Sequence, residues 1–555
     1  MNKKVCSFPI LFALLALLIG TCAVVFPASA QAAPTSTGSI TVSGTVASSY
    51  DAYQIFSANV VDGDSDAKIA TDLAWASDAV RAAALPVMHS DGMPNSQTTA
   101  QEAAEWLNTD SHLTSALSAQ LARSLQSSGA VSVALNAGTA AELPCGYWLI
   151  VADDDAIAQG EAGTAPIMAL VGGSAVTVKP KAATPKVAKH VLEDSAAAWQ
   201  KAADATVADD LYWRLSATVP AGLTAYDTYT VRFVDTMSAG LDPSKVAASM
   251  RVYAAAGADG GFDAVQAGKD GRAGTEPAKG WTDITAQCAT KVAADGTFTV
   301  RTGDLIAALG GADAFTAGAR VVAVYNAPLN SACNHGIAKG NPNEVYLRYP
   351  RSPFADQSGD AGFTRTPSDD ACAYTWDLAL TKRGSDGDKP LAGAVLSITD
   401  DRDRTLAADG TWDAEGKATV TTGEDGRVTV SGVDSGKLEV RELKAPKGYT
   451  AFEGTRSVTV KAEGLDVDQV AAAKPKLTVT AESPLRADSA DGSTGSLEAS
   501  LINTPTGTPP SITTGGFMPS TGDMAMYAAA AAAVAGAALI VVALLVKRGG
   551  GSHKE

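Results

Sequence analysis

Trp376-Asp377-Leu378-Ala379-Leu380-Thr381-Lys382 alternates large apolar residues with small or polar ones, which is the pattern of a β-strand with one buried face. The face that carries Trp376, Leu378 and Leu380 next presents Lys382. A lysine that points into an apolar core costs free energy unless an opposite charge or a hydrogen bond meets it. The stretch therefore predicts a β-sandwich whose core encloses a lysine with a partner.

Two later strands of the same segment carry polar residues into the same core. The apolar face of residues 438 to 440 continues into Glu442, and that of residues 497 to 501 continues into Asn503. Burial lowers the pKa of a lysine and raises that of a carboxyl group, so a neutral amine can lie beside a protonated acid. The acid can then polarise the asparagine carbonyl for attack, and ammonia leaves. The expected product is an isopeptide crosslink between Lys382 and Asn503.

The middle segment shows the pattern again, with an aspartate. Lys189 shares a strand face with Val187 and Val191, while Asp235 follows residues 231 and 233 on another. Asn343 opens a third face, which residues 345, 347 and 349 continue. A lysine, a carboxyl group and an amide are thus expected in this core as well.

Residues 440 to 449, Val-Arg-Glu-Leu-Lys-Ala-Pro-Lys-Gly-Tyr, resemble the E-box of collagen-adhesin B-type domains in sortase-assembled Gram-positive pilins. Residues 377–382 and 390–394 resemble the opening strand and first turn of that domain. The resemblance implies that Lys382 is the nucleophile, Asn503 the acceptor and Glu442 the promoting acid.

Residues 199–203, 234–241 and 340–347 resemble the second domain of major fimbrial shaft proteins. That resemblance implies a bond from Lys189 to an asparagine of the closing strand, promoted by Asp235. Asn343 is the acceptor we expect. Asn341 has the same parity along the strand and stays an alternative.

The end of the chain resembles the cell-wall sorting signal of Gram-positive surface proteins. Met518-Pro519-Ser520-Thr521-Gly522 precedes the uncharged run 524–546 and then Lys547-Arg548. Such a run is long enough to cross a bilayer as one helix, and the basic tail would stay cytoplasmic. The resemblance implies that a sortase cuts between Thr521 and Gly522 and passes the threonyl group to an amine. An ordinary membrane anchor is the alternative.

The other end of the chain has the features of a secretory signal. Lys3 and Lys4 precede an apolar stretch, and small residues follow at 27–30. Residues 1–30 are therefore interpreted as a signal peptide, with the mature chain beginning near Gln31.

The mature chain predicts a mainly β protein of tandem Ig-like, collagen-adhesin-type β-sandwich domains. Helices are expected to be inserted in the first domain between Ala67 and Leu125, where residues 69, 73, 76, 80 and 84 recur at helical spacing. Boundaries are expected in the proline-rich linker and in the loop 350–370. The expected parts are an N-terminal pilin domain 31–178, a linker 179–186, an isopeptide-forming fimbrial domain 187–360, a collagen-adhesin B-type domain 372–505, a Thr/Pro/Gly spacer 506–517 and the sorting signal 518–555.

The linker carries a lysine that is expected to be exposed. Val178-Lys179-Pro180-Lys181 resembles the pilin motif, whose lysine attacks the sortase acyl-enzyme of the next subunit. Lys181 is the expected nucleophile, with Lys179 or Lys186 as alternatives. Repeated attack would join Thr521 of one copy to Lys181 of another, which builds an open, head-to-tail fibre.

Composition excludes some functions. The chain has 60 Asp and Glu against 43 Lys and Arg, with no basic block in the mature region, so nucleic-acid binding is not expected. The five histidines show no metal-ligand spacing, and we expect no metal and no cofactor. Exported cysteines can pair; of the four in the mature chain, Cys288 and Cys333 are the preferred pair because both flank strands of one domain.

The resemblance as a whole implies a major shaft subunit of a sortase-assembled surface fimbrium, used for adhesion. Its expected partners are pilin-class and housekeeping sortases, other copies of itself, peptidoglycan, and tip and basal pilins. It would not be an enzyme, since each isopeptide bond forms once. The alternative is a wall-anchored adhesin that binds a host ligand and never polymerises.

Overall fold

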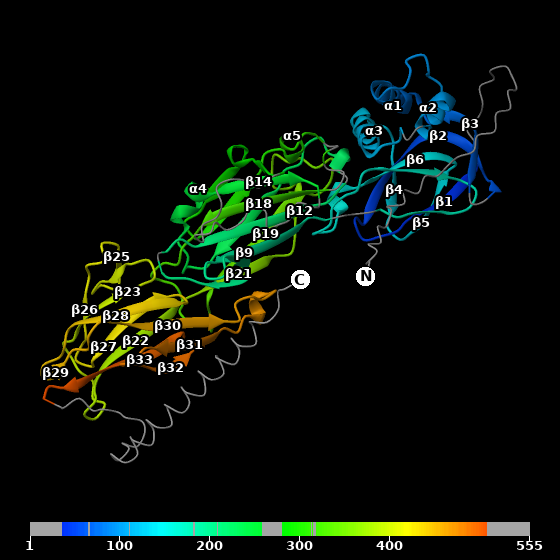
Figure 1. Cartoon of the computed structure of the whole chain (residues 1–555). Helices are drawn as coiled ribbons and strands as arrows, with labels where there is room; N and C mark the ends of the chain where they lie inside the picture. Colours follow the sequence, from blue (N-terminus) through cyan, green and yellow to red (C-terminus); the bar gives the residue numbers. More distant parts are fainter. Residues whose placement is uncertain are drawn as a thin grey trace, which may run out of the picture.

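The computed structural model describes residues 36–507, apart from 65–66, 110–111, 181–183, 208, 222, 258–279, 312–313 and 315–317. The chain is mainly β, as the alternating patterns predict. Its strands form three pairs of sheets in an elongated row (Figure 1). We call these pairs the first, second and third sandwich, in chain order. Among the described residues, no helix is both long and apolar enough to cross a membrane; the expected span 524–546 lies outside them.

The first sandwich packs a small sheet, in the order β5-β1-β8, against a larger one, in the order β3-β2-β6-β7 with β4 beside β2. Its core includes Ile40, Tyr50 and Trp148, all of which are buried. The strands are β1 Thr37–Val42, β2 Ser49–Asp62, β3 Lys68–Trp75, β4 Val133–Asn136, β5 Ala140–Pro144, β6 Gly146–Ala152, β7 Ile167–Val171 and β8 Val176–Val178.

Three helices pack on the other face of the larger sheet: α1 Asp78–Ser90, α2 Ala100–Asn108 and α3 Ser115–Ser128 (Figure 1). Each begins after a hydroxyl residue, Ser77, Thr99 or Thr114, whose side chain accepts a backbone N–H of the first turn. The inserted helices are thus confirmed. The helical interpretation of residues 69 to 75 is wrong, because they lie in β3 and pair with β2, and pairing with a neighbouring strand overrides local spacing.

The second sandwich contains sheets in the orders β10-β9-β12-β18-β14-β15 and β11-β21-β19-β13-β17-β16, with β20 beside β19. Short helices α4 Val246–Ser249 and α5 Leu305–Ala308 lie between strands. The strands are β9 Lys186–Glu193, β10 Ala198–Gln200, β11 Ala202–Asp204, β12 Tyr212–Val219, β13 Arg232–Met237, β14 Arg251–Ala256, β15 Thr282–Asp283, β16 Ala289–Val292, β17 Thr297–Arg301, β18 Ala319–Asn326, β19 Asn341–Pro350, β20 Phe363–Arg365 and β21 Asp369–Tyr374.

The chain stays in the second sandwich beyond the boundary expected in the loop 350–370. Within that range β20 pairs with β19, and β21 then pairs with both β19 and β11. The passage to the third sandwich comes at Thr375, between β21 and the next strand.

The third sandwich contains sheets in the orders β27-β22-β33-β29, with β32 beside β33, and β25-β24-β23-β28-β30-β31, with β26 beside β23. Its first and last strands, β22 and β33, are parallel neighbours. The strands are β22 Trp376–Gly384, β23 Val395–Thr399, β24 Thr405–Leu406, β25 Trp412–Asp413, β26 Val420–Thr421, β27 Arg427–Val433, β28 Gly436–Lys444, β29 Tyr449–Thr450, β30 Thr455–Glu463, β31 Lys476–Ala481, β32 Leu485–Asp491 and β33 Ser496–Pro505.

Polar contacts fix the sandwiches against one another. Between the second and third, Asp204 accepts hydrogen bonds from the Trp376 indole at 2.6 Å and from the Ser435 backbone at 2.8 Å. Between the first and second, the Arg123 guanidinium on α3 donates to the carbonyl oxygens of Ala225 and Pro353 at 3.0 and 3.2 Å. Specific hydrogen bonds therefore connect neighbouring sandwiches at both junctions.

Candidate crosslinking sites

The third sandwich brings together all three residues that the sequence selected. Lys382 comes from β22 and Asn503 from β33 of one sheet, and Glu442 comes from β28 of the facing sheet. Lys382 is 0% exposed, Asn503 2% and Glu442 6%. Strand parity explains the meeting: Lys382 lies opposite Leu501, and Asn503 is the next residue of β33 on the same face.

The geometry of this trio suits transfer of the lysine amine to the asparagine amide. The Lys382 Nζ donates to Asn503 Oδ1 and lies 3.3 Å from Glu442 Oε1. The same Oε1 accepts from Asn503 Nδ2 at 2.9 Å, while Oε2 accepts from the Phe452 backbone at 3.1 Å. One carboxylate oxygen thus contacts both the nitrogen that must lose protons and the nitrogen that must gain one.

Burial prepares the amine for reaction. Loss of water around the Lys382 ammonium lowers its pKa to about 8, although the nearby Glu442 carboxylate opposes the shift. At pH 7 about one tenth of this amine is therefore neutral, and so nucleophilic, which is far more than for an exposed lysine.

The second sandwich brings together Lys189 of β9, Asp235 of β13 and Asn343 of β19, and all three are 0% exposed. Here the lysine stands on one sheet, and the acid and the amide stand on the other. Asp235 lies opposite Val345, so Asn343 is its diagonal neighbour on the same face. A bond from Lys189 to Asn343 would join the two sheets.

A tyrosine that the sequence analysis did not select connects this second trio. The Tyr325 hydroxyl on β18 lies 2.9 Å from Lys189 Nζ, 2.9 Å from Asn343 Nδ2 and 3.2 Å from Asp235 Oδ2. The Asp235 carboxylate also forms an ion pair directly with Lys189. Residues 321, 323 and 325 share one buried face of β18. The sequence signal for Tyr325 was therefore a hydroxyl-bearing residue that follows Val321 and Ala323 on an otherwise apolar strand face.

The alternative acceptor, Asn341, lies elsewhere in the hydrogen-bond network. Its Oδ1 accepts from the Asn334 backbone at 2.8 Å, and its Nδ2 donates to the carbonyl oxygens of Asn334 and Ala373 at 2.9 and 3.2 Å. The described contacts thus hold Asn341 to backbone groups and join Asn343 to the hydroxyl that also binds Lys189.

Burial shifts the pKa values of the lysine and the aspartate of this trio in opposite directions. It lowers the pKa of Lys189 to about 8 and raises that of Asp235 to about 6, and the attraction between them counteracts both shifts. Two buried oxygens, Asp235 Oδ1 and Asn343 Oδ1, have no hydrogen-bond partner among the described residues. If Asp235 carried a proton, its carboxyl group could act as a hydrogen-bond donor, which neither of these two oxygens now has.

The expected disulfide between Cys288 and Cys333 is wrong, because all four described cysteines are free. Cys288 directly precedes β16, and strand pairing carries its position across the sheet: residue 289 of β16 pairs with 301 of β17, which pairs with 232 of β13, which pairs with 348 of β19. Cys288 therefore lies level with the Arg348 end of β19. Cys333 lies near the opposite end, since its neighbour Asn334 is bonded to Asn341. Seven residues of strand span roughly 23 Å, whereas a disulfide needs Cα atoms within about 7 Å.

Several expected sites fall outside the described residues, namely Lys181, the sorting motif Met518 to Gly522 and the signal peptide. The two alternative polymerising lysines, Lys179 and Lys186, are described and exposed. Among the described residues, no three His, Cys, Asp or Glu side chains gather in a way that could hold a metal ion.

Comparison with known proteins gives partial matches. Over 143 residues the chain is 30% identical to the trypsin-resistant surface T6 protein of Streptococcus pyogenes serotype M6 (strain ATCC BAA-946 / MGAS10394), and this match covers 24% of the chain and 24% of that protein. The solved T6 backbone pilin of serotype M6 Streptococcus pyogenes is 17% identical, with 85% of this chain and 98% of that chain covered and a TM-score of 0.45. The full-length major pilin SpaD from Corynebacterium diphtheriae is 15% identical, with the same shares covered and a TM-score of 0.41. Residues 377–474, which begin in β22 and carry Lys382 and Glu442, match the family described as SpaA: Prealbumin-like fold domain.

Proposed function

We propose that the chain is the structural shaft subunit of a covalent, sortase-polymerised cell-surface pilus, held by two intramolecular Lys–Asn isopeptide bonds. The observation that carries the proposal is the contact of an amine, an acid and an amide in the cores of both the second and the third sandwich. The match of residues 377–474 to a SpaA domain and the identity with a trypsin-resistant surface protein support it.

In the third sandwich the neutral Lys382 amine attacks Cγ of Asn503. Glu442 Oε1 accepts a proton from the attacking nitrogen and returns it to the leaving Nδ2, which departs as ammonia. The C–Nδ2 bond breaks and a C–Nζ amide bond forms, so the reaction needs no cofactor or oxidant. Each bond forms once, and the chain turns over no substrate.

In the second sandwich Asp235 is the acid and Tyr325 is the bridge. Asp235 Oδ1 and Asn343 Oδ1 both lack a partner among the described residues, so a proton on Asp235 would serve the Asn343 carbonyl, and the Tyr325 hydroxyl connects the lysine nitrogen to the leaving amide nitrogen. The hydroxyl occupies the place in this trio that Glu442 Oε1 occupies in the other. Asp235 and Tyr325 together therefore supply what a single glutamate supplies in the third sandwich.

The two bonds suit a chain that transmits tension. The bond between Lys382 and Asn503 connects the first and last strands of one sandwich, and the bond between Lys189 and Asn343 connects the two sheets of another. Force applied along the chain would then pass through covalent bonds instead of strand hydrogen bonds.

Polymerisation would join the sorting motif of one copy to the linker lysine of another. A pilin-class sortase cleaves after Thr521 and transfers it to Lys181 of another copy, and a housekeeping sortase transfers the last subunit to peptidoglycan. The protein is then secreted, anchored to the cell wall and joined to tip and basal pilins.

Co-expression with a pilin-class sortase on a Gram-positive host tests this assembly. The proposal predicts a ladder of covalent multimers that resists boiling in detergent, and loss of the ladder in the Lys181→Arg variant. The Lys179→Arg and Lys186→Arg variants are matched controls that should keep it. A chain that reaches the wall only as a monomer would instead be the adhesin that never polymerises.

A further inference from the structure

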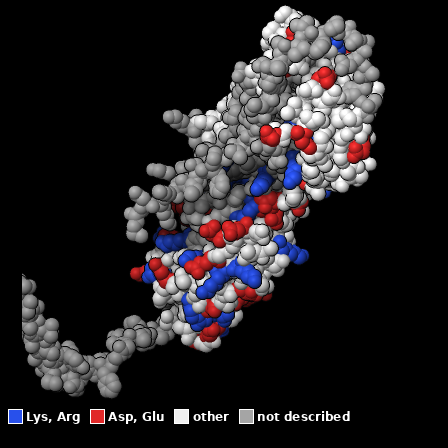
Figure 2. Space-filling model, turned by 90° about the vertical axis from the view of Figure 1, so that its right-hand side faces the viewer, with Lys and Arg blue, Asp and Glu red and all other residues white. Residues whose placement is uncertain are grey.

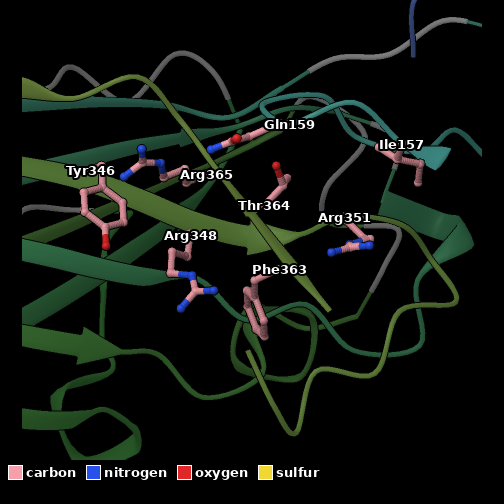
Figure 3. Close-up of a pocket in the computed structure, with 8 residues that line it drawn as sticks. All are labelled: Ile157, Gln159, Tyr346, Arg348, Arg351, Phe363, Thr364 and Arg365. Atoms are coloured by element: carbon pink, nitrogen blue, oxygen red, sulfur yellow. The ribbon is translucent and has the colours of Figure 1, made fainter. Parts of the chain in front are cut away.

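A cavity lies at the junction of the first and second sandwiches, away from both crosslinking sites. It has a volume of about 460 Å³, within the range of small-ligand sites. Figure 3 shows Ile157 and Gln159 from the first sandwich facing residues of β19 and β20 from the second. The lining residues are Ile157, Gln159, Tyr346, Arg348, Arg351, Phe363, Thr364 and Arg365.

The walls of this cavity are fixed by hydrogen bonds between the two sandwiches. The Gly160 backbone donates to the Thr364 hydroxyl at 2.8 Å, and the Tyr349 hydroxyl donates to the Gly160 carbonyl at 2.8 Å. The Gly163 backbone donates to the Arg351 carbonyl at 2.5 Å. A site held in this way is preorganised, which lowers the entropy cost of binding.

The cavity concentrates positive charge on an acidic chain with a net charge of −17. Figure 2 shows mainly acidic charges on the visible face of the first sandwich, at the top of the molecule. Three guanidinium groups line the cavity, and they differ in their partners. Arg348 is paired with Asp360 at 3.1 Å, and Arg351 donates to the Asp154 carbonyl at 3.1 Å and lies 3.8 Å from the exposed Asp155 carboxylate.

The Arg365 guanidinium has fewer protein partners than the other two. Its guanidinium lies over the Tyr346 ring, 5.0 Å from the centroid, and none of the described carboxylates forms an ion pair with it. A stacked guanidinium keeps its in-plane N–H groups for a planar anion such as a carboxylate. Arg365 is thus the lining group that is best able to receive an anion.

The remaining lining groups fit a sugar. The Gln159 amide and the hydroxyls of Thr364 and Tyr346 can pair with several ligand hydroxyls, and Phe363 and Ile157 add an apolar surface for the C–H face of a ring. We infer that this cavity binds an acidic sugar, whose carboxylate or sulfate group pairs with Arg365. The inference does not rest on the pilus role, because it needs neither crosslink nor polymerisation.

Titration calorimetry with three sugars on one lactose core tests the site. The chain from Gln31 to Thr521 is suitable, because it contains every described contact. We expect 3′-sialyllactose or 3′-sulfolactose to bind at least tenfold more tightly than neutral lactose, and the stronger of the two identifies the acid group. Equal binding of lactose, or no binding of either acidic sugar at millimolar concentration, would overturn the inference.

Variants assign the binding to this cavity. Arg365→Gln should weaken binding of the acidic sugar at least tenfold, while Arg441→Gln, an exposed arginine on β28, should leave it unchanged. The melting temperature of each variant checks that it is folded. Unchanged binding in the Arg365→Gln variant contradicts the assignment, as does tighter binding of a hexaglutamate peptide than of either acidic sugar.

Discussion

At the scale of residues, a hydroxyl and a carboxylate oxygen occupy equivalent places in the two trios. The Tyr325 hydroxyl lies within 2.9 Å of both the lysine nitrogen and the amide nitrogen. Glu442 Oε1 lies 3.3 and 2.9 Å from the corresponding atoms. We therefore expect Tyr325 to orient the reacting groups in the second sandwich, where Asp235 has no direct bond to the amide among the described contacts.

The Tyr325→Phe variant tests this role. The ring is kept and the hydroxyl is lost, which removes bonds to charged groups worth about 1–3 kcal/mol. Formation of the bond between Lys189 and Asn343 should slow by about 10- to 100-fold. Mass spectrometry at timed intervals after refolding measures it, and Tyr374→Phe, a buried tyrosine outside the trio, is the control.

The same reaction should depend on pH with a maximum. Below about pH 6 both Asp235 and Lys189 hold a proton, so the amine cannot attack. Above about pH 8 the amine is neutral but the acid is ionised, so the carbonyl is not polarised. Crosslinking of chain refolded from inclusion bodies should be fastest between these values. A rate that rises steadily to pH 10 would contradict the role of Asp235.

Strand parity predicted that both lysines, both acids and Asn503 enter the two cores, since a period of two places every second side chain on one face. Parity left Asn341 and Asn343 equivalent, and only the hydrogen bonds of Asn341 to Asn334 and Ala373 separate them. Tyr325 was missed because a tyrosine at the end of an apolar face looks like an ordinary core residue. The cavity between the first and second sandwiches was also missed, since it lies between segments as far apart in the chain as Gly160 and Thr364, which are 204 positions apart.

At the scale of elements, β22 and β33 are the strands that the proposed bond would join in the third sandwich. A covalent bond between Lys382 and Asn503 would close a loop of 121 residues. By analogy with disulfides, such closure would stabilise the folded state by about 5 kcal/mol. The two strands are already parallel neighbours, so the bond would join side chains of adjacent strands.

The Glu442→Ala variant should show this contribution. Without the acid the bond does not form, and the melting temperature of the third sandwich should fall by about 15 °C or more. Calorimetry measures the shift, and Glu439→Ala, an exposed position on the same strand, is the control. If both variants melt at the wild-type temperature, no stabilising bond depends on Glu442.

Helices and strands were predicted correctly where the spacing of apolar residues agrees with the pairing of strands, and wrongly where the two differ. Residues 69, 73 and 76 have helical spacing, yet the first two lie in β3, which pairs with the edge of β2. The cysteine pair failed for a similar reason, because strand order decides whether two residues of one domain meet.

At the scale of the whole molecule, the first sandwich differs from the other two. Between residues 31 and 178 it has a single lysine, Lys68. This amine donates to the Ser174 carbonyl at 2.6 Å and lies 3.6 Å from the half-exposed Asp62 carboxylate. No buried asparagine amide meets it among the described contacts, so we expect no crosslink in this sandwich.

A protease should therefore digest the first sandwich more readily than the second and third. Proteinase K at rising temperature should digest the first sandwich while the second and third persist as one resistant fragment beginning near Lys186, because local opening controls cleavage. N-terminal sequencing of the fragment measures this. Digestion of all three at one temperature would mean that no crosslink distinguishes them.

The most direct test of the account is the intact mass of the chain from Gln31 to Thr521, with peptide mapping of the crosslinked lysines. The account predicts that the wild-type mass is lower than the sequence mass by two molecules of ammonia, and that Glu442→Ala and Asp235→Ala each restore one. Fragments should join Lys382 to Asn503 and Lys189 to Asn343. A wild-type mass equal to the sequence mass would contradict the central claim.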